Sequence, residues 1–227
     1  MVPLNDENPT ETTPYIVYGL IAINALIFFF QKTIPEPQIQ SFFQTWALVP
    51  REFTQSLDDN LVQGLGEWLT LFSSQFLHGN LMHILGNMLF LWIFGNNIED
   101  CLGHFKFLIF YLGCGSIAAL SQWFFSPDSL VPLVGASGAI AGVMGAYILR
   151  FPRAHIVTLI PLGFFFTTIR IPAILFLGFW FLQQAFFSFI SLQASGMGGG
   201  GVAYWAHAGG FVFGVVLAPL MGLFDRE

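Results

Sequence analysis

The sequence predicts an all-α polytopic membrane protein, a bundle of six transmembrane helices whose fourth helix is short and submerged. Composition is the first reason: 55% of the 227 residues are hydrophobic and only 9% are charged, whereas soluble domains carry roughly 25% charged residues. The mean hydropathy is accordingly high, at +0.70. The second reason is that apolar runs recur along the whole chain, and runs of about 20 apolar residues can cross a bilayer as helices.

The order of these runs predicts the domain organisation. A polar, acidic tail over residues 1–14, which we expect to be flexible, precedes a single membrane domain over residues 15–227. Aromatic residues are frequent in the polar segment 35–76, which predicts a loop in the membrane interface. We expect residues 150–170 to form a loop with an apolar stretch that dips into the membrane, and residues 194–202 a glycine-rich loop. The predicted spans are residues 15–34, 81–98, 105–125, 137–149, 171–192 and 203–224.

Basic residues predict the orientation of these spans. Those on the side of the two termini are Lys106, Arg150, Arg153, Arg170 and Arg226, and only Lys32 and Arg51 fall on the opposite side. The positive-inside rule therefore places both termini in the cytoplasm, and we expect a multi-pass protein of a prokaryotic inner membrane. The net charge of −6 disfavours a nucleic-acid partner. The oligomeric state is not predicted.

The stretch Gly135-Ala136-Ser137-Gly138 opens the predicted fourth helix. A serine in a first helical turn lies beside unpaired backbone N–H groups and the positive end of the helix dipole, which stabilise developing negative charge. A helix over 137–149 is about 20 Å long, whereas the hydrocarbon core is about 30 Å thick. Ser137 is therefore expected roughly 10 Å below the outer surface, in a wet cavity, because irregular backbone at that depth needs one. The simpler alternative is that Ser137 only caps the helix.

His207 lies one to two turns into the predicted sixth span, at a depth similar to that of Ser137. Gly210 and Gly214 form a surface of small residues on that span, and Gly138 belongs to another on the fourth, so the two helices can approach closely. Close approach would join a nucleophile to a general base. The alternative is a histidine that only makes a hydrogen bond within the bundle.

His83 and Asn87 are four residues apart, so they share one face of the second span. Both side chains can donate hydrogen bonds to an oxyanion, although polar contacts between helices would use the same residues. The spacing of His78 and His83, with no neighbouring glutamate, does not match a zinc protease of the His-Glu-x-x-His kind, and we expect neither a metal nor a cofactor. No aspartate lies centrally within a span, which disfavours an aspartyl protease.

Taken together, these motifs resemble the rhomboid family of intramembrane serine proteases in its basic six-span form. The resemblance covers nearly everything after the tail, and Glu99 and Gly103 also fit the family pattern. It implies that Ser137 is the nucleophile and His207 the general base of a dyad. It further implies that the oxyanion is bound by His83, Asn87 and the Ser137 backbone N–H, with supporting roles for His78, Gly135, Gly138, Gly210 and Gly214. The implied substrates are single-span membrane proteins, cut within or near the outer part of their transmembrane helices.

The chain departs from the family pattern at two positions. Ala141 stands where members often carry an aromatic residue that stacks on the histidine, which leaves open what holds His207. Trp68-Leu69 replaces the Trp-Arg of the first loop. Two alternatives to a protease are a non-catalytic rhomboid-like protein that binds membrane clients and, with less support, a small-solute channel.

Overall fold

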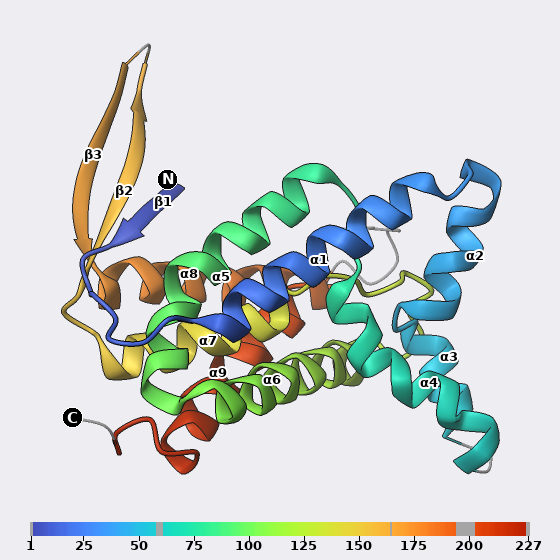
Figure 1. Cartoon of the computed structure of the whole chain (residues 1–227). Coiled ribbons are helices and arrows are strands. Elements are labelled where there is room, and N and C mark those ends of the chain that lie inside the picture. The colour runs from blue at the N-terminus through green and yellow to red at the C-terminus, as the bar shows by residue number, and fades with distance from the viewer. Residues whose placement is uncertain (1, 58–60, 164, 194–202, 226–227) are drawn as a thin grey trace.

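The computed structural model describes residues 2–57, 61–163, 165–193 and 203–225. Six apolar helices form a bundle, with shorter helices at one end and a small β-sheet at the other (Figure 1). The six helices coincide with the six predicted spans and confirm the helical membrane bundle. They are α1 (Tyr15–Thr33), α5 (Leu81–Leu102), α6 (His104–Phe125), α7 (Ser137–Arg150), α8 (Ala173–Gln193) and α9 (Tyr204–Leu220). The predicted glycine-rich loop over 194–202 and Arg226 lie outside the described residues.

The helices differ in length. Within the described part of the chain, α1, α5, α6 and α8 are long and apolar enough to cross a membrane, and α9 is shorter, with 17 residues. α7 has only 14 residues, about 21 Å of helix. A short fourth helix was predicted, and the structure starts it at Ser137.

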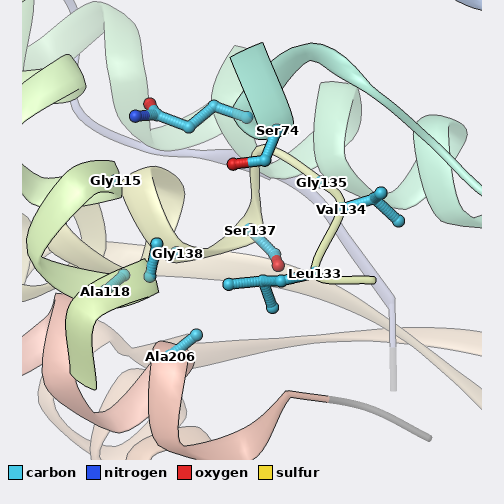
Figure 2. Close-up of a pocket in the computed structure, with 11 residues that line it drawn as sticks. Ser74, Gly115, Ala118, Leu133, Val134, Gly135, Ser137, Gly138 and Ala206 are labelled. Atoms are coloured by element: carbon cyan, nitrogen blue, oxygen red, sulfur yellow. The ribbon is translucent and has the colours of Figure 1, made fainter. Parts of the chain in front are cut away.

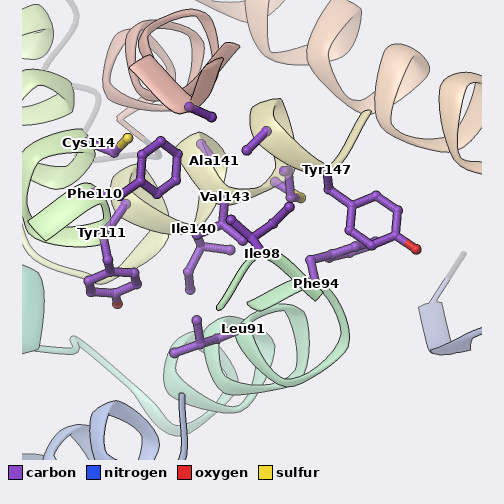
Figure 3. Packing of buried hydrophobic residues seen from close by; sticks show 14 of the residues in the cluster. Leu91, Phe94, Ile98, Phe110, Tyr111, Cys114, Ile140, Ala141, Val143 and Tyr147 are labelled. Atoms are coloured by element: carbon purple, nitrogen blue, oxygen red, sulfur yellow. The ribbon is translucent and has the colours of Figure 1, made fainter. Parts of the chain in front are cut away.

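α7 occupies the centre of the bundle. All its residues from Gly138 to Tyr147 are buried, because α5, α6 and α9 pack around it. Figure 3 shows Ile140, Ala141 and Val143 of α7 between apolar side chains of α5 and α6. A helix that is apolar on every side belongs in the interior of a bundle, so burial holds the start of α7 in a fixed position.

The segment predicted as an interfacial loop is instead mostly helical. It contains α2 (Glu36–Trp46), α3 (Pro50–Ser56), α4 (Leu61–Ser73) and the 3-10 helix η1 (Ser74–Phe76). Exposed aromatic side chains, Trp46 and Trp68 among them, are consistent with an interfacial position. An antiparallel bridge pairs Leu48, between α2 and α3, with Leu133. It connects this group of short helices to the irregular chain that leads into α7.

A three-stranded antiparallel sheet corrects two further expectations. β1 (Val2–Asp6) pairs with β2 (His155–Leu162), and β2 pairs with β3 (Phe165–Pro172). The amino-terminal tail is therefore partly a strand rather than wholly flexible, and the loop after α7 is a hairpin. The physical reason is that β-branched residues favour extended backbone, and strand pairing satisfies the backbone polar groups of both segments.

The carboxylate of Glu99, near the end of α5, fixes the start of α1. Glu99 is fully buried and accepts hydrogen bonds from the backbone N–H groups of Ile16 and Val17, at 2.9 and 2.8 Å. It also contacts Nδ1 of His104 at 2.6 Å. A carboxylate at a helix N-terminus satisfies otherwise unpaired N–H groups, so α1 is held against α5.

Candidate active site

Ser137 is the first residue of α7, directly after a turn that only glycine fits well. Gly135 has φ +121°, in the region that residues with a side chain rarely adopt. A Cβ at this position would also fall 2.8 Å from Nε2 of His83. The backbone N–H of Gly135 donates to the carbonyl oxygen of Ser74 at 2.9 Å. The backbone conformation, the packing and the hydrogen bond at Gly135 thus all fix the path of the chain just before Ser137.

The structure brings His207 of α9 to Ser137 of α7. Nε2 of His207 lies 2.7 Å from Oγ of Ser137, although the residues are 70 positions apart in sequence. The close contact of the two helices explains this distance. A Cβ at Gly210 would overlap the carbonyl oxygen of Gly138, so the helices can be this close only because position 210 has no side chain.

The second ring nitrogen of His207 has a partner that was not predicted from the sequence. Nδ1 of His207 lies 2.8 Å from Oε1 of Gln184 on α8, and Gln184 is buried. The ring of Trp180, one helical turn earlier on α8, has its centroid 5.8 Å from that of His207. Gln184 therefore occupies the supporting role that the absence of an aromatic residue at Ala141 left open. A polar residue in an apolar span was the signal that could have found it.

His83 and Asn87 lie beside the turn that precedes Ser137, since a Cβ at Gly135 would fall close to the side chains of both. Asn87 is buried, and its Nδ2 contacts Nε2 of the buried His78 at 2.9 Å. The rings of His78 and His83 are in edge contact, with centroids 5.1 Å apart. His83 and Asn87 thus lie together beside the residues that lead into Ser137, and His78 contacts Asn87.

A small cavity adjoins Ser137, between η1, the chain that leads into α7, and residues of α6 and α9. Its volume is about 20 Å³, enough for roughly one water molecule. Ser74, Gln75, Gly135, Ser137 and Ala206 are among the residues that line it (Figure 2). Backbone and side-chain polar atoms of these residues make it a site that water can occupy at the depth of the serine.

The arrangement has the parts that acyl transfer requires. An oxygen nucleophile lies in hydrogen-bond contact with an imidazole, and a third side chain orients that imidazole. Side chains that can donate hydrogen bonds, His83 and Asn87, lie beside the turn that precedes the nucleophile. All these groups are carried by α5, α7, α8 and α9 rather than by flexible loops.

Comparison with known proteins gives a consistent result. The Rhomboid domain family model matches residues 65–224, which include Ser137, His207 and the other predicted site residues. The chain is 28% identical over 207 residues to Rhomboid protein 1, mitochondrial, of Saccharomyces cerevisiae, a match that covers 88% of this chain and 51% of that protein. It is 31% identical over 165 residues to the Rhomboid protease GluP of Bacillus subtilis, covering 73% of this chain and 28% of that protein. The chain therefore spans about half or less of the length of these relatives.

Proposed function

This chain belongs to the rhomboid family, and on that premise we propose that it is an intramembrane serine endopeptidase that uses a Ser137–His207 dyad. The observation that carries the proposal is the 2.7 Å contact between Nε2 of His207 and Oγ of Ser137 at the start of a buried helix. The name of one relative, a rhomboid protease, supports the same activity. The proposed substrates are single-span membrane proteins, cut within or near the outer part of their helices.

In the proposed first step, Nε2 of His207 removes the proton of Ser137 as Oγ attacks a peptide carbonyl carbon. Oγ must carry the hydrogen of the Ser137–His207 contact, so Nε2 must have a free lone pair. The resulting imidazolium then donates its proton to the nitrogen of the departing peptide, and an acyl-enzyme remains. A transmembrane helix hides its carbonyl groups in its own hydrogen bonds, so the substrate must unwind locally before attack.

We propose that Gln184 selects the reactive tautomer of His207. Oε1 of a glutamine side chain can only accept a hydrogen bond, so the 2.8 Å contact to Nδ1 favours the imidazole with its hydrogen on Nδ1. That tautomer leaves the Nε2 lone pair directed at Ser137.

The tetrahedral intermediate places negative charge on the former carbonyl oxygen. His83, Asn87 and the Ser137 backbone N–H are proposed to donate hydrogen bonds to it. His78 holds the Asn87 amide through the 2.9 Å contact, which lowers the cost of orienting that donor during the reaction. Water from the cavity lined by Ser74 and Gln75 is the proposed nucleophile in the second half of the reaction, with His207 as base.

The direct test is cleavage of a model single-span substrate by the purified protein in vesicles. Ser137→Ala should abolish cleavage while leaving the thermal unfolding temperature nearly unchanged, because it removes one oxygen only. Ser121→Ala, also on a spanning helix, α6, is the matched control: its hydroxyl donates to the carbonyl of Ile117 at 2.9 Å, and the variant should cleave at the normal rate.

A fluorophosphonate probe separates the protease from its two alternatives. Labelling that is lost in Ser137→Ala supports the protease. Capture of membrane clients without labelling or cleavage would support a non-catalytic client-binding protein. Solute flux through vesicles without labelling would support a channel lined by His83, Asn87 and His207. Either of the last two outcomes would overturn the proposed function.

A further inference from the structure

The β2–β3 hairpin has two faces of different chemistry. Directly paired residues of an antiparallel ladder point to the same face, so the register assigns each side chain. One face carries the pairs Ile156/Ile171, Thr158/Ile169, Ile160/Thr167 and Leu162/Phe165. The other face carries His155/Pro172, Val157/Arg170, Leu159/Thr168 and Pro161/Phe166. None of the side chains on the first face is charged.

Contacts near the base of the hairpin show that this uncharged face points to the helix bundle. Ile156 is fully buried and belongs to the bundle core. Asp6, its partner on β1, accepts hydrogen bonds from the Tyr147 hydroxyl at 2.6 Å and from Nδ2 of Asn97 at 2.9 Å. On the opposite face, Arg170 forms an ion pair with Glu7 at 3.0 Å. The charged face is therefore turned away from the bundle.

The hairpin extends beyond the helices it starts from. Figure 1 shows β2 and β3 running across the helix axes and projecting sideways, at the end of the bundle where β1 and the end of α9 lie. The outer residues of the uncharged face are consequently uncovered by protein. Ile169 is 41% exposed, Leu162 59% and Phe165 78%.

We propose that the outer part of this uncharged face lies on the lipid bilayer, with Leu162, Phe165 and Ile169 in the boundary between headgroups and acyl chains. The helices cross the membrane, so the surface that borders the bundle on this side of the hairpin is lipid. A strand pair that runs across the helix axes lies along that surface rather than into it. Apolar and aromatic side chains are favoured at this boundary, and threonine hydroxyls can reach its polar groups.

Continuity with α8 supports lipid over a protein partner. β3 runs directly into α8, whose first turn exposes Ile174 and Leu175, at 52% and 63%. These side chains belong to a helix long and apolar enough to cross a membrane, so the apolar face of the hairpin continues a surface that already faces lipid. Contact at the hairpin would fix the height of the start of α8 in the bilayer. This inference does not depend on proteolytic activity.

Paired cysteine variants on the two faces test the proposal. Phe165→Cys and Ile169→Cys place a label on the proposed lipid side, and their sequence neighbours Phe166→Cys and Thr168→Cys place it on the other side. Phe166 is the strict control, because it is also aromatic and is 71% exposed. The unsubstituted protein sets the background, since Cys101 and Cys114 are buried. Each variant is labelled with an environment-sensitive fluorophore and reconstituted into phosphatidylcholine vesicles with and without a nitroxide-bearing phosphatidylcholine.

Quenching by the nitroxide lipid should be several-fold stronger at positions 165 and 169 than at 166 and 168. It should change little when anionic lipid or salt is added, because the face carries no basic side chain for either to act on. Equal quenching within each pair, or stronger quenching at 166 and 168, would overturn the assignment. A blue-shifted emission at 165 and 169 without lipid quenching would place protein on this face and would overturn it too.

Discussion

α9 and α8 both border α7, yet their contacts are of different kinds. α9 meets α7 backbone against backbone: a Cβ at Gly214 would overlap the carbonyl oxygen of Gly142, and one at Gly145 would overlap that of Phe211. α8 has open space beside Gly178 and exposes much of its apolar surface. Its buried residues, within the described part of the chain, are Ala173, Leu177, Gln184 and Ser188.

This difference separates the two groups proposed to react from the group proposed to orient the histidine. Ser137 and His207 are carried by the α7–α9 pair, where side-chain-free contacts leave no room for adjustment. Gln184 is carried by α8, where few buried side chains resist movement. The distance between Ser137 and His207 is thus set by close packing, whereas the proposed choice of the His207 tautomer depends on a helix with few buried side chains. In the proposed mechanism, a movement of α8 would act on His207 through its hydrogen bond to Gln184.

The largest expected effect comes from a side chain at the α7–α9 contact. Gly210→Val places atoms on the Gly138 carbonyl, and overpacking of this kind costs about 1–3 kcal/mol or more. The helices must separate, and a displacement of about 1 Å at reacting groups can cost 10²-fold in rate. We expect cleavage to fall by at least about that factor, measured with a single-span substrate in vesicles.

Gly178→Val is the matched control on α8, because no atom beyond its chain neighbours and its own helix backbone lies within 4 Å of its Cβ position. It should leave both cleavage and the unfolding temperature close to those of the unsubstituted protein, since substitutions away from packed features are usually within about 0.5 kcal/mol. If Gly210→Val and Gly178→Val lost similar amounts of cleavage activity, the α7–α9 contact would tolerate an added side chain as well as α8 does, and the comparison would be wrong.

Much of the fold could be predicted because the membrane restricts the choices. Long apolar runs must be helices when they span lipid, so all six helices were located, and the small residues near Ser137 and His207 predicted which two would meet. The hairpin and β1 were not predicted, because residues 150–170 are apolar enough to suggest membrane entry. β1 pairs with β2, which is about 150 residues away in sequence, and a local hydrophobic pattern does not indicate such a distant pairing.

Gln184 shows why the site could be predicted only in part. Ser137, His207, His83 and Asn87 lie in motifs whose spacing relates them to a helix start or a helix face. Gln184 has no such spacing, and its neighbour Gln183 looks equivalent in the sequence. Only the rotation of α8 about its axis decides which of the two amides reaches His207, and this rotation is set by tertiary packing.

Replacing Gln184 tests whether the looser helix contributes to catalysis. Gln184→Leu keeps most of the side-chain volume but removes the acceptor for Nδ1 of His207. We expect kcat to fall on the order of 10- to 100-fold with KM nearly unchanged, less than the roughly 10⁴-fold loss from replacing the carboxylate of a serine-protease triad. The imidazole of the variant can still sample the reactive tautomer, which limits the loss.

Gln184→Glu restores an acceptor oxygen at the same distance and should recover most of the lost kcat. A purely structural role would give the reverse, because a buried carboxylate is harder to accommodate than leucine. Nitrogen-15 NMR of the imidazole in a Ser137→Ala background reports the tautomer without activity. If the hydrogen stays on Nδ1 to the same extent in Gln184→Leu, Gln184 does not select the tautomer, whatever the standing of the protease assignment.

The smallest effect concerns β1, which links the two regions: Asp6 bonds to Tyr147 of α7, and β1 pairs with the hairpin that leads into α8. Burial raises the pKa of the Asp6 carboxyl above its ordinary value of 3.8, and the hydrogen bonds from Tyr147 and Asn97 offset part of that rise. A carboxyl with a raised pKa binds its proton more tightly when β1 is docked than when it is released. Docking of β1 is therefore strongest below pH 3.8 and weakens as the pH rises through the raised pKa.

Hydrogen exchange at the β2 amides that face β1, corrected for the intrinsic pH dependence of exchange, measures this docking. Protection should fall as the pH rises, and Asp6→Asn, which cannot ionise but keeps an acceptor oxygen, should remove the pH dependence. The change should not exceed about tenfold, because single hydrogen bonds contribute about 0.5–1.5 kcal/mol. Protection at the first turn of α8 should follow the same curve if β1 couples the fixed pair of helices to the looser one. A pH-dependent β2 with an unchanged α8 would mean that the hairpin moves independently of the helix it precedes.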